Sequence, residues 1–376
     1  MKILWVKYIR VIVLMSLMVL SPNVSMTQET QAPHLIITPE NVDDISHLLD
    51  YQSHTSRTYG IAFDLEGRHL FAVGENEGEN FSVFTVFSLE NREFRIPEQP
   101  QLRGLQDVQF IAGSLAIDET MLLIMNGNIV VWDILSDAPV GVISQNYSTI
   151  TTHLGHRWIL VASGETGLLS VWDIPSLPPS PTAEPPPPPP PEPPFDWIAS
   201  LKGATQLDGP IADVGYDPVH GILVLGRDGN LHRLLLNEGF IFEHSETLPQ
   251  EPPVGAQPQV VARDKDLIAF DSEQEWIAYA GSYQDVVVYD YDEGQQLLRY
   301  PVDEFVVCLM TSPNKDLLVI GDNGPNATLI FINTSTFEEV GRVNIGSFIS
   351  DCAFSPDGTM IATATEVGVT SLWGIQ

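Results

Sequence analysis

A short run of carboxylates is the first feature of this sequence that could do chemistry. Asp290, Asp292 and Glu293 stand just before Gly294, and calcium loops begin with oxygen ligands at alternate positions. A calcium loop also needs a third oxygen ligand and a bidentate glutamate farther along, and neither occurs at the required spacing. The valine-rich run 285–289 directly before them indicates a strand. We therefore interpret the carboxylates as part of a hairpin turn that ends at glycine.

A pair of histidines is the second candidate. His153 and His156 lie three residues apart, a spacing that on a helix could begin a zinc site. Their surroundings indicate strand and turn, and no cysteine or glutamate nearby completes a ligand set. The chain also contains no Gly-x-Ser-x-Gly elbow, phosphate-binding loop or dinucleotide fingerprint. We therefore predict no catalytic residue, no cofactor and no metal ligand, and the sequence assigns no binding residues.

The net charge limits the partners. The 376 residues include 17 Lys and Arg against 49 Asp and Glu, a formal net charge of −32. Phosphate backbones and anionic membrane surfaces attract basic patches, so we predict no nucleic-acid partner and no adhesion to such a membrane. With so many acids some carboxylates meet by chance, so a general acid and base cannot be assigned from composition. We interpret the acidity as favouring solubility rather than as a cation-binding face.

The elements that must position these residues are short strands arranged in repeats. Near its end the chain reads Ala353-Phe354-Ser355-Pro356-Asp357-Gly358 and continues with apolar residues at 360–362. Proline presets the first dihedral angle of a turn and glycine accepts a positive φ, so this segment predicts a hairpin between two strands. Degenerate copies begin at Ala62, Tyr216, Ala269 and Thr311.

A second recurring feature marks the third strand of each repeat. An aromatic or aliphatic residue followed by another residue, mostly small or polar, occurs at Phe87-Ser88, Trp132-Asp133, Trp172-Asp173, Leu234-Leu235, Tyr289-Asp290, Ile332-Asn333 and Trp373-Gly374. The spacings are 45, 40, 62, 55, 43 and 41 residues, and all but the two long ones match the 40–45-residue period of propeller blades. The long intervals contain proline-rich insertions at 175–194 and 249–258. Because the tryptophans follow the repeat, we predict that they pack between sheets and do not bind sugars.

The insertion at 175–194 holds 13 prolines, including an unbroken run over 185–191. Proline has no amide donor, so the insertion is predicted to be exposed polyproline II outside any sheet. Repeat sequence resumes at 195–201, which places the insertion in the hairpin between the third and fourth strands of the third repeat. A domain linker is the alternative. If the insertion lies within one repeat, it should project from the face that carries the Ser-Pro-Asp-Gly turns and serve as a spacer or a docking strip.

The sequence resembles the WD-repeat family in its alternating apolar strands, its Ser-Pro-Asp-Gly turn and its pairs Trp132-Asp133 and Trp172-Asp173. The resemblance covers residues 43–376 and implies an all-β fold, a single seven-bladed β-propeller of four-stranded antiparallel blades. Residues 27–42 resemble the entry segment of exported bacterial WD-repeat proteins. Since the chain stops after a third strand, we expect residues 44–51 to complete the last blade and close the ring.

The sequence also departs from the family. In members with complete motifs, a Gly-His pair before the blade and an aspartate in the second turn bond to the tryptophan. Here Gly203-Ala204 stands at the Gly-His position. The turn aspartate is present as Asp228, but Asn126 and Thr166 replace it in the second and third repeats. We therefore expect an incomplete polar network.

Cys308 and Cys352 are the two cysteines, and they allow one disulfide in an exported chain. Each precedes a Ser-Pro turn by a few residues, which places them on equivalent strands of neighbouring blades. Such strands splay apart in a propeller, so we expect two buried free thiols, and a disulfide between them is the alternative.

Residues 1–26 are predicted to be a secretory signal peptide. Three basic residues within the first ten precede an apolar run at 11–20 and polar residues at 21–23. The apolar run is short for a membrane span. We expect cleavage after Ser25 or Thr27, with an uncleaved anchor as the alternative. The mature protein is then secreted, periplasmic or at the cell surface, with no membrane insertion after signal removal.

Two functions remain open from the sequence. The family resemblance implies an exported, non-catalytic scaffold, which we expect to be a monomer that binds a protein or peptide partner. The alternative is a propeller enzyme, a hydrolase or lyase with a carboxylate-based site in the axial channel. Such sites use clustered His, Asp or metal ligands, and we find no such cluster in the sequence. We therefore favour the binding scaffold over the enzyme.

Overall fold

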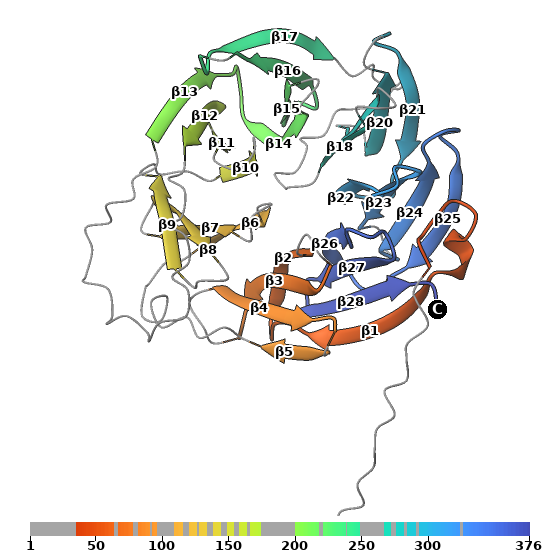
Figure 1. Ribbon diagram of the computed structural model, residues 1–376. Helices are drawn as coiled ribbons and strands as arrows, with labels where there is room; N and C mark the ends of the chain where they lie inside the picture. Colours follow the sequence, from red (N-terminus) through yellow and green to blue (C-terminus); the bar gives the residue numbers. More distant parts are fainter. Residues whose placement is uncertain are drawn as a thin grey trace, which may run out of the picture. The chain divides into compact units, whose positions relative to one another are not determined.

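The fold is taken from a computed structural model of the chain (Figure 1). The structure describes residues 35–63, 67–77, 82–90, 92–95, 109–115, 120–125, 128–133, 138–143, 149–153, 158–163, 166–173, 200–217, 221–237, 239–248, 267–271, 276–281, 284–290, 293–323 and 326–376. The predicted signal peptide and the proline-rich insertion at 175–194 lie outside these residues.

The described chain is all-β, and its strands form seven antiparallel sheets of four strands each. In chain order they are sheet 1 with β2 (Arg57–Phe63), β3 (His69–Glu75), β4 (Ser82–Ser88) and β5 (Glu93–Arg95); sheet 2 with β6 (Gln109–Leu115), β7 (Thr120–Met125), β8 (Asn128–Asp133) and β9 (Ala138–Ile143); sheet 3 with β10 (Thr149–His153), β11 (Trp158–Ser163), β12 (Leu168–Asp173) and β13 (Ser200–Gln206); sheet 4 with β14 (Ile211–Asp217), β15 (Gly221–Gly226), β16 (Leu231–Leu236) and β17 (Phe242–Leu248).

The remaining sheets follow the same order of strands. They are sheet 5 with β18 (Ile268–Asp271), β19 (Trp276–Ala280), β20 (Asp285–Asp290) and β21 (Gln296–Pro301); sheet 6 with β22 (Val306–Thr311), β23 (Leu317–Asp322), β24 (Thr328–Asn333) and β25 (Glu339–Asn344); sheet 7 with β26 (Ile349–Phe354), β27 (Met360–Thr365), β28 (Val369–Gly374) and β1 (Ser46–Gln52). Every member of the predicted series from Phe87-Ser88 to Trp373-Gly374 lies in the third strand of its repeat; in sheet 7 this is β28, with the fourth strand supplied by β1. The repeats predicted from the sequence are therefore the sheets of the structure.

Burial falls from the inner strands of a sheet to its outer strand. All residues of β19 and β23 are buried, whereas β21 and β25 are mostly exposed or half-buried. A strand buried on both faces needs an almost continuous apolar sequence, and Leu317–Asp322 has one. Neighbouring sheets therefore pack face to face over their inner strands.

The first strands also contact one another in a regular succession. β2 contacts β6, and the contacts continue through β10, β14, β18, β22 and β26. β26 in turn contacts β2, so the succession returns to its beginning.

Sheet 7 combines strands from both ends of the described chain. β1 pairs antiparallel with β28, from Ser46 opposite Gly374 to Gln52 opposite Val369, and Figure 1 shows the two strands side by side. The strand predicted at 44–51 therefore forms, with Asp44 instead ending a short 3-10 helix, Val42–Asp44. Cross-strand pairing between residues more than 300 positions apart ties the N-terminal strand to the last repeat.

The entry segment before β1 is part of the same packed unit. Ile37 is fully buried and Val42 is 2% exposed, and both join a core cluster with residues of sheets 6 and 7. The amide of Ile37 donates to the carbonyl of Gly358 at 2.9 Å. No helix among the described residues has the length and apolar character needed to cross a membrane.

Candidate binding surface

Sheets 6 and 7 each present a phenylalanine to solvent directly before their first strand. Phe305 precedes β22 and is 51% exposed, and Phe348 precedes β26 and is 53% exposed. Val367, in the turn between β27 and β28, is 59% exposed. All three lie at the end of the sheets where the chain enters the first strand. The name Phe305/Phe348 surface is used below for these three residues and the carboxylates beside them, Asp303, Glu304 and Glu366.

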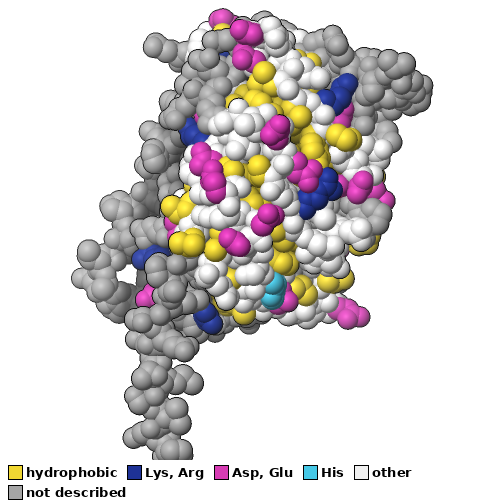
Figure 2. Space-filling view, turned by 90° about the vertical axis from the view of Figure 1, so that its right-hand side faces the viewer, with side chains coloured by type: hydrophobic (Ala, Val, Ile, Leu, Met, Phe, Trp, Pro, Cys, Tyr) yellow, Lys and Arg dark blue, Asp and Glu magenta, His cyan; other side chains and the backbone are white. Residues whose placement is uncertain are grey.

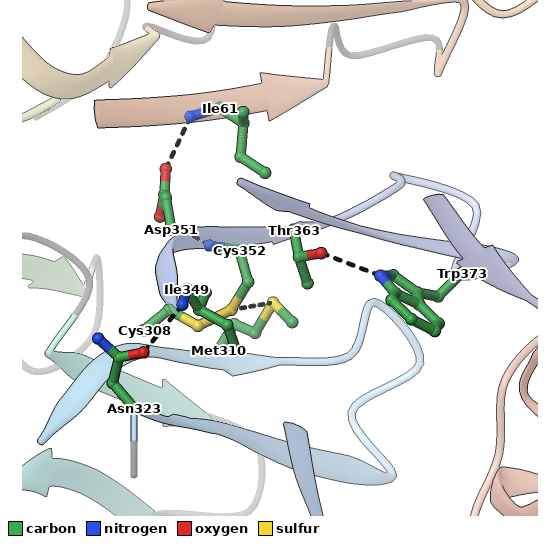
Figure 3. The surroundings of a disulfide bond; sticks show 9 residues. All are labelled: Ile61, Cys308, Met310, Asn323, Ile349, Asp351, Cys352, Thr363 and Trp373. Atoms are coloured by element: carbon green, nitrogen blue, oxygen red, sulfur yellow. Dashed lines mark hydrogen bonds between the residues drawn. A yellow bond between two sulfur atoms is a disulfide. The ribbon is translucent and has the colours of Figure 1, made fainter. Parts of the chain in front are cut away.

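Hydrogen bonds hold the backbone of this surface in place across two sheets. The amide of Asn323 donates to the carbonyl of Phe305 at 2.9 Å, and the amide of Glu366 donates to the carbonyl of Phe348 at 3.2 Å. The side chain of Asn323 also accepts the amide of Ile349 at 2.9 Å, as Figure 3 shows. The two aromatic side chains are therefore displayed from connections that are bonded to each other through Asn323.

The carboxylates of the surface are held in the same way. Asp322 is 2% exposed and accepts the amides of Asp303 at 2.9 Å and of Glu304 at 3.4 Å, which fixes the loop that carries these two exposed acids. Glu366, in the turn beside Val367, forms an ion pair of 3.1 Å with Arg57 of sheet 1. The surface thus carries exposed apolar side chains together with exposed carboxylates.

Buried aspartates join neighbouring sheets beneath their connections. Asp351 of β26 is fully buried and accepts the amide of Ile61 in sheet 1 at 2.7 Å and the amide of Cys352 in its own strand at 2.8 Å (Figure 3). Asp213 of β14 accepts the amide of Leu267, just before β18, at 2.8 Å. A carboxylate with two acceptor oxygens can bond its own strand and the next sheet at once.

The expectation of two free thiols is wrong, because Cys308 and Cys352 form a disulfide with a Cα–Cα distance of 5.8 Å. The prediction assumed that equivalent strands of neighbouring sheets splay apart. The cysteines lie on β22 and β26, the first strands of sheets 6 and 7, and first strands are those that contact each other. Gly321 on β23 leaves room for the bond, since a Cβ there would lie 2.3 Å from the Cys308 Sγ.

The carboxylate run that suggested calcium forms a hairpin turn. Asp290 ends β20, and its side chain accepts the amide of Glu293 at 2.8 Å. Gly294 has a φ of +61°, a left-handed conformation that explains glycine at this position. Asp292 lies outside the described residues. Within those that the structure describes, no group of three or more His, Cys, Asp or Glu side chains could hold a metal ion.

The structure also places the other residues singled out in the sequence. His153 ends β10, while its side chain and all of His156 lie outside the described atoms. Trp172 and Trp373 are 6% and 8% exposed, and their indole N–H groups donate to Ser170 and Thr363, both at 2.9 Å. Both tryptophans are thus buried in the sheets, as predicted, and do not line an open surface.

The assignment of Gly203-Ala204 to the position before a blade is wrong, because both residues pair with β12 inside strand β13. The mistake came from starting the fourth strand too early. A histidine does precede the first strand of sheet 1: His54 is 1% exposed, and its Nδ1 lies 3.1 Å from Thr58 Oγ1. Ser53 bonds the same hydroxyl at 2.8 Å, so a buried polar cluster joins sheets 7 and 1.

A small pocket of about 70 Å³, open to solvent, lies at the end of sheet 4 where the chain enters its first strand. It is lined by Leu207, Asp208, Gly209, Pro210, Ile211, Val224, Gly226, Asp228 and His232. Asp228 is held within its own turn by the amide of Asn230 at 3.0 Å. The aspartate therefore shapes the turn.

Sequence analysis missed Phe305 and Phe348, the residues that define the surface. Both stand one residue before a first strand, in Phe305-Val306 and Phe348-Ile349. Their recurrence one repeat apart was the available signal. The sequence alone does not say that the rings are exposed, because the apolar residues that follow them, Val306 and Ile349, are buried.

No known family model matches the chain, and no curated protein matches it. The class of protein must therefore be argued from its own residues. Figure 2, which faces the right-hand side of Figure 1, shows more acidic than basic side chains among the apolar ones on that side.

Proposed function

We propose that this chain is an exported, seven-bladed β-propeller of the WD-repeat type that binds a protein or peptide and catalyses no reaction. The closed succession of contacts from β2 through β26 back to β2 supports the ring. The pairing of β1 with β28 supports its closure by the two ends of the chain.

The observation that carries the binding function is the Phe305/Phe348 surface. Two aromatic side chains about half exposed, on connections fixed by hydrogen bonds, lose little conformational freedom when a partner covers them. Aromatic residues are enriched at protein interfaces, and the rim of such sites is polar and open to solvent.

A peptide-display selection tests this proposal. Peptides selected on the wild-type protein should lose at least about tenfold in affinity for the double variant Phe305→Ser/Phe348→Ser, as expected when binding hot spots are removed. Ile241→Ser/Leu297→Ser is the matched control, because these apolar residues are 61% and 41% exposed in sheets 4 and 5. Equal binding to both double variants would contradict the proposed surface.

Export is tested separately by cell fractionation of the full chain. The processed protein should appear outside the cytoplasm. Deletion of residues 2–20 should retain the protein in the cytoplasm. Finding the unaltered chain in the cytoplasm would remove the export part of the proposal and leave the binding part untouched.

A further inference from the structure

We propose that the Phe305/Phe348 surface binds a cationic peptide segment in which arginine or lysine side chains alternate with aliphatic ones. This inference rests on the proposed function and names the chemistry of its partner.

Acidic residues adjoin the exposed apolar residues in the sequence. Asp303 and Glu304 directly precede Phe305, and Glu366 precedes Val367. The guanidinium of Arg57 forms an ion pair with Glu366, one of these acids. The surface therefore keeps an excess of negative charge, and a partner of positive charge would be attracted to it while an acidic one would be repelled.

The backbone that carries Asp303 and Glu304 is fixed by hydrogen bonds. The buried carboxylate of Asp322 accepts the amides of both Asp303 and Glu304. Because the backbone of this loop is already fixed, it gives up little backbone entropy when a cation binds to the exposed acids.

An exposed phenylalanine beside carboxylates suits the side chain of arginine or lysine, which has an apolar stem and a charged end. Arginine and lysine carry an apolar stem that covers an aromatic ring and a charged end that reaches a carboxylate beyond it. A cation over the ring face gains further attraction, most effectively as a planar guanidinium. Aliphatic residues between the basic ones would cover Val367, which is 59% exposed.

The net charge of −32 adds a long-range effect to these local contacts. An acidic protein attracts a basic partner before contact, and the attraction weakens as salt is added. This makes the inference measurable by its dependence on ionic strength.

The test uses three fluorescein-labelled peptides of about eight residues, which present alternate side chains to the surface. Leucine alternates with arginine in the first, with glutamine in the second and with glutamate in the third. We expect the arginine peptide to bind most tightly and the glutamate peptide not to bind. Raising NaCl from about 50 to about 300 mM should weaken the arginine peptide by about tenfold and change the glutamine peptide little.

Two charge-matched variants locate the effect. Asp303→Asn/Glu304→Gln should weaken the arginine peptide by about threefold to tenfold, in keeping with the loss of rim charges. Glu293→Gln/Glu338→Gln removes the same number of exposed acids from turns between third and fourth strands and should change binding little. Phe305→Ser/Phe348→Ser should remove most of the affinity.

The outcomes separate the two proposals. If display-selected peptides require Phe305 and Phe348 but are neutral or acidic, and the arginine peptide does not bind, the surface stands and the cationic partner is wrong. If the arginine peptide binds equally to wild type and to all variants, its attraction is to the acidic chain as a whole, and the inference is wrong as well. If no peptide requires the two phenylalanines, the proposed surface itself fails.

Discussion

In three of the first strands, the residue that follows the bulge joins neighbouring sheets, and it does so by two different chemistries. The register shifts just before Asp213 in β14, before Cys308 in β22 and before Asp351 in β26, so the three residues are structurally equivalent. Asp213 and Asp351 accept an amide of the following sheet, whereas Cys308 is bonded covalently to Cys352 there. The disulfide therefore occupies the place that a buried carboxylate has at the other two joints.

Replacing either aspartate should destabilise the protein. Asp351→Ala would leave the amides of Ile61 and Cys352 without the carboxylate that they bond, and we expect a loss of about 2–4 kcal/mol in unfolding free energy. Asp213→Ala should have a comparable effect. Chemical denaturation measures both, and Asp303→Ala, an exposed acid, should change stability by less than about 0.5 kcal/mol. A small effect of Asp351→Ala would mean that water replaces the carboxylate.

Breaking the disulfide should also destabilise the protein, because it closes a loop with a sequence separation of 44 residues. We expect a reductant to lower the unfolding free energy by about 2–5 kcal/mol, the usual range for a native disulfide. The variant Cys308→Ser/Cys352→Ser should lose a similar amount and should no longer respond to the reductant. Thermal melts with and without dithiothreitol measure the difference. A wild-type melt that does not change on full reduction would show that the bond adds nothing to stability.

At the scale of elements, the N-terminal segment does more than lead into the first repeat. Residues 46–52 supply the fourth strand of sheet 7, and the segment before them contributes Ile37 to the core of sheets 6 and 7. At the edge of the sheet, Ser371 Oγ donates to Asp50 at 2.6 Å and His47 bonds the same carboxylate at 2.7 Å. Three kinds of interaction thus attach the N-terminal segment to the C-terminal repeat.

Two substitutions only two positions apart test this attachment. Ile37 is fully buried, so Ile37→Ala should lower the unfolding free energy by about 2–4 kcal/mol through the loss of packing. Leu35 is 56% exposed, and Leu35→Ala should cost less than about 0.5 kcal/mol. Deleting residues 27–52 should have a far larger effect than either, since it exposes the edge of β28. Equal stability of the two alanine variants would place the entry segment outside the folded unit.

At the scale of the whole molecule, carboxyl groups whose pKa is lowered in the folded state make stability depend on pH. Burial acts to raise the pKa of Asp50, but the hydrogen bonds from Ser371 and His47 outweigh it and leave the pKa below its usual value. The same balance holds for Asp357, where burial is outweighed by the bonds from Ser355 and Thr359. A carboxyl group with a lowered pKa in the folded state adds stability above its unfolded pKa, near 4, and loses it as the pH falls through the folded value.

We therefore expect the melting temperature to be steady from about pH 7 to about pH 5 and to fall below about pH 4. Asp50→Asn should melt below the wild type at neutral pH, and the difference should shrink as the pH falls and the wild-type carboxyl becomes protonated. Scanning calorimetry over this range measures both curves. A difference that stays constant down to about pH 2.5 would show that the charge of Asp50 does not contribute.

The local pattern of the sequence was sufficient to predict the third strand of each repeat and the grouping of the strands, although it started the fourth strand of sheet 3 too early. The turn residues Pro356 and Gly358 lie between two strands of one repeat, as predicted. The recurring residues from Phe87 to Trp373 lie in the third strands of the repeats. The fourth strand at 44–51 was also predictable, because the last repeat lacked one. These features follow from alternation and turn chemistry, which neighbouring residues determine among themselves.

The distance between strands that are far apart in the sequence was decided only by the tertiary structure. Cys308 and Cys352 are bonded because first strands approach each other. Ile37 is buried and Phe305 and Phe348 are exposed although all are apolar, because burial depends on which other sheet covers a side chain. Sequence spacing carries the repeat, but contact and exposure are set by how the repeats pack together.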